Sequence, residues 1–212
     1  MDGPTLQGLI AKGYQRGAAH IGSAHNWYRG PYLNPMTAPY LLGSLPAAFA
    51  VDAQFKSLGK QQTIWWRAFV DTTQVQLGDI LAGPETWVIV DGGLRPPTAL
   101  VCPQTISISR AVQQFSQSAG ASQTLTPIVT DYPCNIQLKR DKGFSEPLGF
   151  AAPSNTSAPM PMWMIYLPIL KDGVILPADM LIDDDGNTYK VDAVNYGIYG
   201  YEIAATPYEP PA

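Results

Sequence analysis

The chain has 212 residues, of which 46% are hydrophobic and only 14% are charged, and its formal net charge is −4. This hydrophobic content excludes an intrinsically disordered protein, and the scarcity of charged residues excludes a coiled coil. Its 19 glycines and 20 prolines would interrupt helices often, which favours a mainly β protein with many turns.

The charge is unevenly distributed along the chain. Residues 1–120 contain eight Lys and Arg against six Asp and Glu, whereas residues 121–212 contain five against eleven. The two halves therefore carry +2 and −6, and neither has the basic surplus of a nucleic-acid-binding domain. Lys139, Arg140 and Lys142 form one short basic group, which we interpret as a solvated loop.

The N-terminal region predicts one helix followed by an arm. Pro4 suits a first helical turn, and apolar residues recur at helical spacing over residues 4–18. Residues 19–45 are almost uncharged and rich in Gly, Pro, Tyr and Asn, so we expect an extended arm that packs on its own barrel or on a neighbouring subunit. Aromatic side chains bury large areas at interfaces at low entropic cost. The arm residues that we assign to a subunit interface are Trp27, Tyr28, Tyr32 and Tyr40.

β-Branched and aromatic runs predict strands through the rest of the chain. No residue between Arg110 and Asp131 is charged, and the sequence SQSAGASQT within this stretch is typical of a linker, so we place a domain boundary there. The expected fold is mainly β, with two small tandem β-barrel or sandwich domains, a short N-terminal helix and an extended arm. The expected units are the helix and arm (1–45), a first β-barrel domain (46–120) and a second (121–212). The predicted strands are 63–70, 86–90, 98–102, 105–109, 126–137, 162–167, 188–193 and 198–205.

Two segments about one hundred residues apart share one pattern. GDILAGPETWVIVDGG follows an aromatic strand in the first half, and ADMLIDDDGNTYKVDAVN follows one in the second. Aligning Asp79 with Asp179 places DIL on DML and sets Trp87 against Tyr189. An Asp before a short strand and a tight turn predicts a hairpin, whose aromatic return strand closes one face of a small barrel. This indicates an internal duplication, the alternative being two unrelated segments with a common hairpin style.

The second copy, from Ala178 to Val191, resembles a module of small β-barrel proteins of tailed phages that reads roughly GDII-D-x-DG-x-x-Y-x-V. The resemblance is to head–tail connector, stopper and neck proteins of phages or prophages. It covers about residues 163–207 and, more weakly, 65–109, but not the first 45. It implies a ring-forming structural protein between portal and tail, without an active site. Simple stoppers have one barrel, so the double module departs from them.

Neither the cysteines nor the histidines indicate a site. Cys102 and Cys134 match no zinc or redox spacing, and we interpret them as buried free thiols. His20 and His25 have no Cys or carboxylate cluster beside them, and a zinc site would need two further ligands. We therefore expect no metal and no cofactor at these residues.

Three adjacent carboxylates, Asp183, Asp184 and Asp185, invite a calcium interpretation. An EF-hand loop with Gly186 at its sixth position would begin at Leu181, which cannot bind calcium. A solvated hairpin turn is the preferred interpretation, and weak metal binding is left open.

No motif predicts catalysis or membrane insertion. The patterns G-x-S-x-G, GxxxxGK[ST] and GxGxxG are absent, although carboxylates from distant strands could still converge. The N-terminus does not look like a signal peptide, and the apolar run at 160–170 is too short and too rich in proline to span a bilayer. We expect a protein that is not an enzyme, is made in the host cytoplasm and contacts no membrane.

These observations and the resemblance together lead us to expect a virion protein that forms a homo-oligomeric ring in the neck of a tailed phage. The ring would bridge the portal or its adaptor to the tail, around a lumen through which DNA passes without specific binding. An acidic second half facing this lumen would repel DNA. One alternative is a tail-side baseplate or fibre-attachment adaptor. Another is a carbohydrate-binding module or glycan hydrolase, whose exposed Trp and Tyr would stack on sugars.

Overall fold

The computed structural model describes residues 3–51, 64–92, 96–116, 120–139, 162–168 and 174–208. Within these ranges the chain is mainly β, with a single α-helix at the N-terminus. The helical elements are α1 (Gly3–Ile21) and the short 3-10 helix η1 (Ala38–Tyr40). The strands are β1 (Ser23–Tyr28), β2 (Leu41–Val51), β3 (Trp65–Phe69), β4 (Ile80–Ala82), β5 (Thr86–Asp91), β6 (Thr98–Val101), β7 (Gln104–Ser116), β8 (Gly120–Lys139), β9 (Met162–Pro168), β10 (Met180–Asp183), β11 (Thr188–Gly197) and β12 (Gly200–Pro207).

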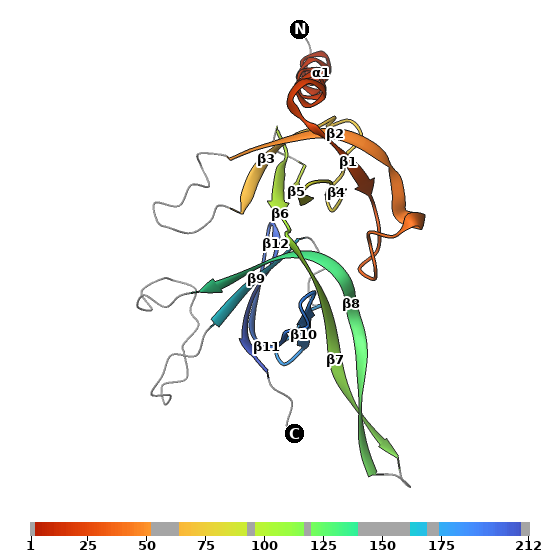
Figure 1. Cartoon of the computed structure of the whole chain (residues 1–212), viewed down its shortest axis with the longest axis vertical. Helices are drawn as coiled ribbons and strands as arrows, with labels where there is room; N and C mark the ends of the chain where they lie inside the picture. Colours follow the sequence, from red (N-terminus) through yellow and green to blue (C-terminus); the bar gives the residue numbers. More distant parts are fainter. Residues whose placement is uncertain are drawn as a thin grey trace.

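The strands form two closed six-stranded barrels in tandem, one above the other in Figure 1. The first barrel has the strand order β1-β2-β3-β6-β5-β4, and β1 closes it by pairing with β4. The second has the order β7-β8-β9-β12-β11-β10, closed by β7 and β10. Adding six to each strand number in the first order gives the second order, so the two barrels have the same topology. The predicted mainly β fold with tandem barrels and an N-terminal helix is confirmed.

Alternation of side chains explains why the central strands are so apolar. On β5, Trp87 and Ile89 pack in the interior of the first barrel, whereas Val88 and Val90 pack outside it. Both faces of the strand are buried, so its sequence is a continuous apolar run and does not alternate with polar residues. The second barrel has its own interior, which includes Leu181, Tyr189 and Ile203.

The outward side chains of β5 belong to an apolar contact between the two barrels, which we call the seam. It contains Ile80, Val88, Val90 and Leu100 of the first barrel, against which Tyr166 and Tyr199 of the second are packed. Trp65 contacts both tyrosines, with ring centroids 6.1 Å and 5.0 Å away. Asn135 of β8 adds a hydrogen bond from Nδ2 to the Val101 carbonyl at 2.9 Å. The barrels therefore share a packed interface.

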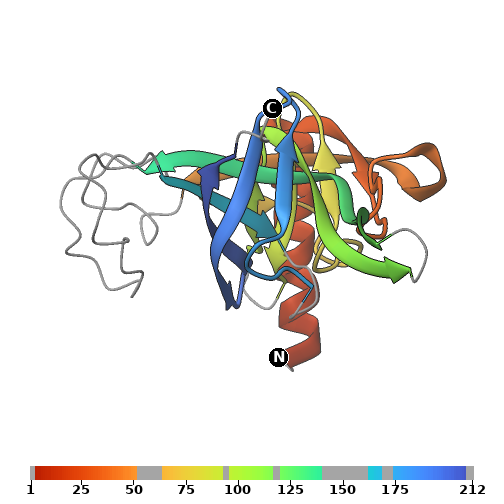
Figure 2. The ribbon, with the colours of Figure 1, turned by 90° about the horizontal axis from the view of Figure 1, so that it is seen from below.

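Helix α1 extends from one side of the first barrel and projects away from the strands (Figure 2). It packs against β2 and β3, where Ala11 and Ala18 are buried and Tyr14 contacts Phe69 edge to face. The helix ends where a Cβ at Gly22 would lie 2.4 Å from the Ala18 carbonyl oxygen, so only glycine fits there. The helix predicted for residues 4–18 is present.

The structure places the arm and the barrel junction differently from the sequence prediction. Residues 23–28 and 41–51 of the expected arm and first domain are β1 and β2, so the arm packs on its own barrel as a part of it. The uncharged stretch after Arg110 is a long hairpin of β7 and β8, not a linker between domains. The far ends of β7 and β8 project at the end of the molecule opposite α1 (Figure 1), and residues 117–119 lie outside the described residues. The barrels join between β6 and β7, at Cys102 and Pro103.

Both cysteines are free and buried, as the sequence predicts. Burial raises the pKa of the Cys102 and Cys134 thiols well above the ordinary value, so both stay protonated near neutral pH. In the described part of the chain, no helix has the length and apolar character needed to cross a bilayer.

Candidate functional site

The repeated hairpins have the same register in the two barrels. Leu81 pairs with Trp87 in the first, and Leu181 pairs with Tyr189 in the second. A β-bulge follows at matching places, between Ile89 and Asp91 and between Val191 and Ala193. The register is the one that aligning Asp79 with Asp179 predicts, so the internal repeat is confirmed as a structural repeat.

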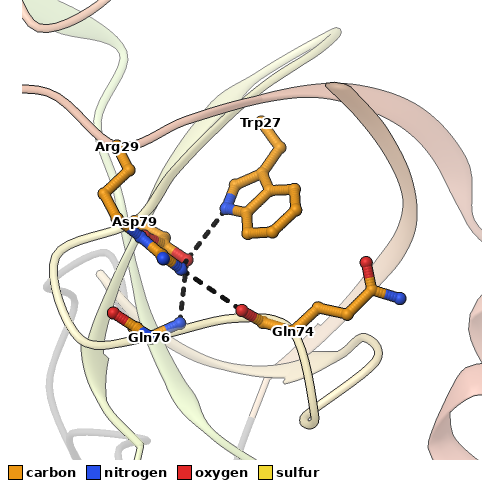
Figure 3. A network of polar contacts seen from close by, with 5 residues as sticks. All are labelled: Trp27, Arg29, Gln74, Gln76 and Asp79. Atoms are coloured by element: carbon orange, nitrogen blue, oxygen red, sulfur yellow. Dashed lines mark hydrogen bonds and ion pairs between the residues drawn. The ribbon is translucent and has the colours of Figure 1, made fainter. Parts of the chain in front are cut away.

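Asp79 stands at the start of the first hairpin and is completely buried. Its carboxylate accepts two hydrogen bonds from Arg29, from Nε at 2.7 Å and from Nη2 at 2.9 Å. It also accepts the indole N–H of Trp27 at 2.8 Å and the backbone N–H of Gln76 at 2.8 Å. Arg29 in turn donates to the Gln74 carbonyl at 3.2 Å. Figure 3 shows these five residues, which we call the Asp79 cluster.

Asp179 has the same arrangement in the second barrel. Arg110 donates to it from Nε at 2.7 Å and from Nη2 at 2.8 Å, and the backbone N–H of Leu176 donates at 2.8 Å. The second bond of Arg110 Nη2 goes to the Val174 carbonyl at 2.8 Å. We call Arg110, Val174, Leu176 and Asp179 the Asp179 cluster. Each cluster ties the loop before the short strand to the first strand of its barrel.

The two clusters differ in one side-chain hydrogen bond to the aspartate. Trp27 lies on β1 opposite Leu81, and the residue opposite Leu181 on β7 is Ile108. An isoleucine cannot donate a hydrogen bond, so the Asp179 carboxylate has no counterpart of the Trp27 bond. Arg29 also lies over the Trp27 ring, with its guanidinium carbon 5.3 Å from the centroid.

Neither cluster has the properties of a catalytic group. Each carboxylate oxygen of Asp79 and Asp179 accepts a hydrogen bond from the protein, and both side chains are buried, so neither carboxylate is accessible to a substrate. The hydrogen bond to Asp79 raises the pKa of Arg29 above its ordinary value, more than partial burial lowers it. The guanidinium therefore stays charged, and the pair serves to fix the loop.

Asp183 lies at the turn of the second hairpin and is buried, although the sequence suggested a solvated turn. Its carboxylate accepts the Asn187 N–H at 2.7 Å, the Asn187 side-chain amide at 2.9 Å and the Tyr189 hydroxyl at 2.9 Å. Gly186 has a φ of +83°, as the predicted turn geometry requires. Asp184 and Asp185 are exposed beside it. Among the described residues, no group of three or more His, Cys, Asp and Glu side chains could hold a metal ion.

The four aromatic residues predicted at a subunit interface occupy different environments. Trp27 is half-buried against the first barrel core, and Tyr28 packs against the seam. Tyr32 is 37% exposed, and the backbone beside it pairs with β8, where Asn34 N–H donates to Thr130 at 2.9 Å. Tyr40 is half-buried at the end of η1, and its carbonyl accepts the Arg29 N–H at 3.0 Å. The structure does not gather them on one surface.

The histidines and the basic group are also separated. His25 is buried beside Phe49 with ring centroids 5.5 Å apart, and His20 is exposed on α1. Lys139 ends β8, whereas Arg140 and Lys142 lie outside the described residues.

An open groove of about 530 Å³ lies at one edge of the seam. The loop fixed by the Asp79 cluster contributes Leu77, which is 54% exposed, and the turn between β11 and β12 contributes Ile198, which is 83% exposed. The other lining residues are Val90, Asp91, Gly92 and Tyr199. Sequence reasoning missed this surface because it depends on how the barrels pack.

Comparison of the chain with protein-family models, curated proteins and solved structures finds no match.

Proposed function

We propose that this chain is a structural subunit of a ring in the neck of a tailed phage, where it bridges the portal or its adaptor to the tail. The observation that carries the proposal is the pair of projections at opposite ends of a two-barrel body, α1 at one end and the β7–β8 hairpin at the other (Figure 1). A subunit of this form can contact one layer of an assembly with each end.

Both projections carry apolar side chains that the subunit itself does not cover. On α1, Leu9 is 51% exposed, and on the hairpin Val112 and Leu125 are exposed on neighbouring strands. The hairpin continues beyond the closed barrel with no charged residue between Arg110 and Asp131. Natural edge strands usually carry charges that prevent pairing with other chains, so this uncharged hairpin supports burial in an assembly.

Exposed carboxylates on the second barrel support a role around DNA. Asp184 and Asp185 at the hairpin turn and Asp192 on β11 are all exposed, and this half of the chain has the larger acidic surplus. A negative wall lowers the affinity of a channel for passing DNA.

The tryptophans favour a structural role over sugar binding. None of the five is among the exposed side chains, and four pack ring against ring with other aromatic residues inside a barrel or at the seam. A carbohydrate-binding surface would present such rings to solvent for stacking.

The mass of the purified chain tests the proposal, measured alone and with candidate portal, adaptor and tail proteins. We expect a closed oligomer, or a defined complex with a portal or tail ring. Association with baseplate or fibre proteins alone would instead identify a tail-side adaptor. A chain that stays monomeric and binds none of these proteins would contradict the proposal.

A further inference from the structure

We propose that α1 is an autoinhibitory cap: it covers a face of the first barrel that, once uncovered, binds the same face of a second copy. The face is the outer side of β2 and β3 around Ala48 and Phe69, which pair with each other. This inference goes beyond the ring assembly proposed above and does not rest on it, because it concerns a surface that α1 covers within one subunit.

Strand pairing identifies the same face in the second barrel. Trp66 and Trp163 are equivalent, because each pairs with an alanine whose own partner lies two residues after the hairpin aromatic. Each also contacts that hairpin aromatic, with ring centroids 5.3 Å and 5.6 Å apart respectively. Phe69 and Tyr166 follow three residues later, on the opposite, outer side of β3 and β9. They therefore mark one equivalent face of the two barrels.

In each barrel, the element that precedes the first strand lies on this face. On the second barrel it is the first barrel: Trp65 contacts Tyr166 edge to face, with ring centroids 6.1 Å apart, and β5 and β6 contact β9 and β8. On the first barrel it is α1: Tyr14 contacts Phe69 edge to face at 5.8 Å, and the helix contacts β2 and β3. The helix therefore takes the place that a whole barrel takes on the second barrel, so the face beneath it has the position of a barrel-docking surface.

Helix α1 covers this face with small side chains. Ala11 and Ala18 are buried against the barrel, and Tyr14 between them is half-buried. The seam instead contains valine, isoleucine, leucine and tyrosine side chains from the two barrels. Alanine buries less apolar area than these residues, so the helix holds its face less strongly than a barrel holds the counterpart. Of the two covers, α1 is the one that can be removed without separating the barrels.

The second barrel does not present a face like the one that the first barrel places in the seam. On β11, Lys190 and Asp192 stand where β5 has Val88 and Val90, and both charged residues are exposed. Val88 and Val90 themselves are buried within the seam of their own subunit. Among the described residues, a second copy therefore has no free outer strand surface of the seam type to place on the face beneath α1.

The matching surface in a second copy is the same face of its first barrel. Its outer residues Pro46 and Ala48 on β2 and Phe69 on β3 carry no charge, so two such faces meet without like-charge repulsion. The cation of β3, Arg67, donates a hydrogen bond to Thr98 of its own barrel at 3.0 Å. A patch that binds its own copy makes an isologous contact, which closes as a dimer. In the intact chain α1 blocks this contact.

Crosslinking of a truncated chain tests the cap, because both native cysteines are buried. Residues 1–21 are removed, Ala48→Cys places a thiol on the uncovered face, and a short bismaleimide joins thiols that lie close together. We expect a crosslinked homodimer on a denaturing gel. The full-length chain with Ala48→Cys should give at least tenfold less, because α1 covers the position. The matched control is the truncated chain with Asp184→Cys, an exposed turn position, which should also give at least tenfold less.

A peptide with the sequence of residues 1–22 provides a second readout. Added to the truncated chain, it should reoccupy the face and suppress the Ala48→Cys crosslink, whereas the same peptide with Tyr14→Ala should not. Equal crosslinking of the truncated and full-length chains, equal crosslinking at Ala48→Cys and Asp184→Cys, or no effect of the peptide would overturn the proposal.

Circular dichroism and tryptophan fluorescence check that the truncated chain keeps the barrel fold. If it does not, a second variant retains the helix and replaces Ala11 and Ala18 with Asp, which sets two carboxylates against the barrel and lifts α1 from it. This variant should crosslink through Ala48→Cys as the truncated chain is expected to do. Loss of the fold in both chains would show that α1 is a part of the barrel core and not a cap, and would also overturn the proposal.

Discussion

Both barrels tolerate a buried aspartate because N–H groups of the surrounding chain donate hydrogen bonds to its carboxylate oxygens. Asp79 receives four N–H groups, two of them from Arg29. Removing the aspartate leaves the N–H donors of its cluster without an acceptor. The resulting loss of folding free energy is larger than the stabilisation that the ion pair gives relative to an apolar pair of the same size. Arg29 is 38% exposed, so water compensates part of that loss.

Replacing Asp79 with Ala should lower the free energy of unfolding by about 2–3 kcal/mol. The loss is limited because water can hydrogen-bond the partly exposed Arg29 guanidinium in place of the carboxylate. Urea denaturation followed by tryptophan fluorescence measures this change. The control is Asp184→Ala, an exposed carboxylate without hydrogen-bond partners in the described structure, which should change stability by less than about 0.5 kcal/mol. Equal effects of the two substitutions would show that the Asp79 cluster contributes nothing specific.

Asp71 predicts a pH dependence. Burial by itself raises its pKa, but hydrogen bonds from Thr73 and Gln74 outweigh burial and hold the pKa below the ordinary value. The ionised form therefore stabilises the folded state above about pH 4, and this contribution is lost as the pH falls through the lowered pKa. Thermal unfolding of the wild type and of Asp71→Asn should differ most near neutral pH and converge in acid. A constant difference across that range would contradict this assignment.

At the scale of elements, the sequence predicted the strands whose side chains alternate or are buried on both faces. β5, β6, β9 and β11 fall where β-branched and aromatic residues predict them. β1 and the first residues of β2 were interpreted as an arm because residues 19–45 are almost uncharged and rich in Gly, Pro, Tyr and Asn. These strands form through pairing within the closed barrel, which local propensity does not predict.

Alignment of the hairpins identified Asp79 and Asp179 but not their partners. Arg29 and Arg110 are 81 positions apart, whereas the aspartates are 100 apart, because the connections within the barrels differ in length. A search at one fixed offset therefore cannot find the arginines. Barrel closure brings them to the aspartates, and that step depends on tertiary structure.

Two glycines near α1 should respond oppositely to alanine. Gly13→Ala should raise the free energy of unfolding of the monomer by about 0.5–1 kcal/mol, since the added Cβ has open space and alanine favours the helix. Gly22→Ala should destabilise the chain, because its Cβ would lie 2.4 Å from one carbonyl oxygen and 2.5 Å from another. Chemical denaturation measures both, and a stabilising Gly22→Ala would contradict the close approach.

At the scale of the whole molecule, the packed seam leads us to expect that the two barrels unfold together. Trp65 and Trp66 are neighbours on β3 that point to opposite faces, one to the seam and the other to the interior beside Trp87. Trp65→Ala should split a single calorimetric transition into two, because it removes the contacts with Tyr166 and Tyr199.

Its matched control is Trp66→Ala, which should lower the unfolding temperature of the first barrel by removing core volume rather than by loosening the seam. If both variants gave the same single transition, the barrels would be coupled mainly through their two-residue connection and not through Trp65.

Repetition of one strand order within a chain also has a consequence for how the protein reaches its native state. Either arginine could in principle close on either aspartate during folding, and chains with repeated modules characteristically misfold by such exchanges. In the native structure the Trp27 indole donates to Asp79, and Ile108 takes the corresponding place in the second barrel, so an exchange would leave Asp79 without its indole donor. This difference at the aspartate clusters thus makes the two related modules inequivalent partners during folding.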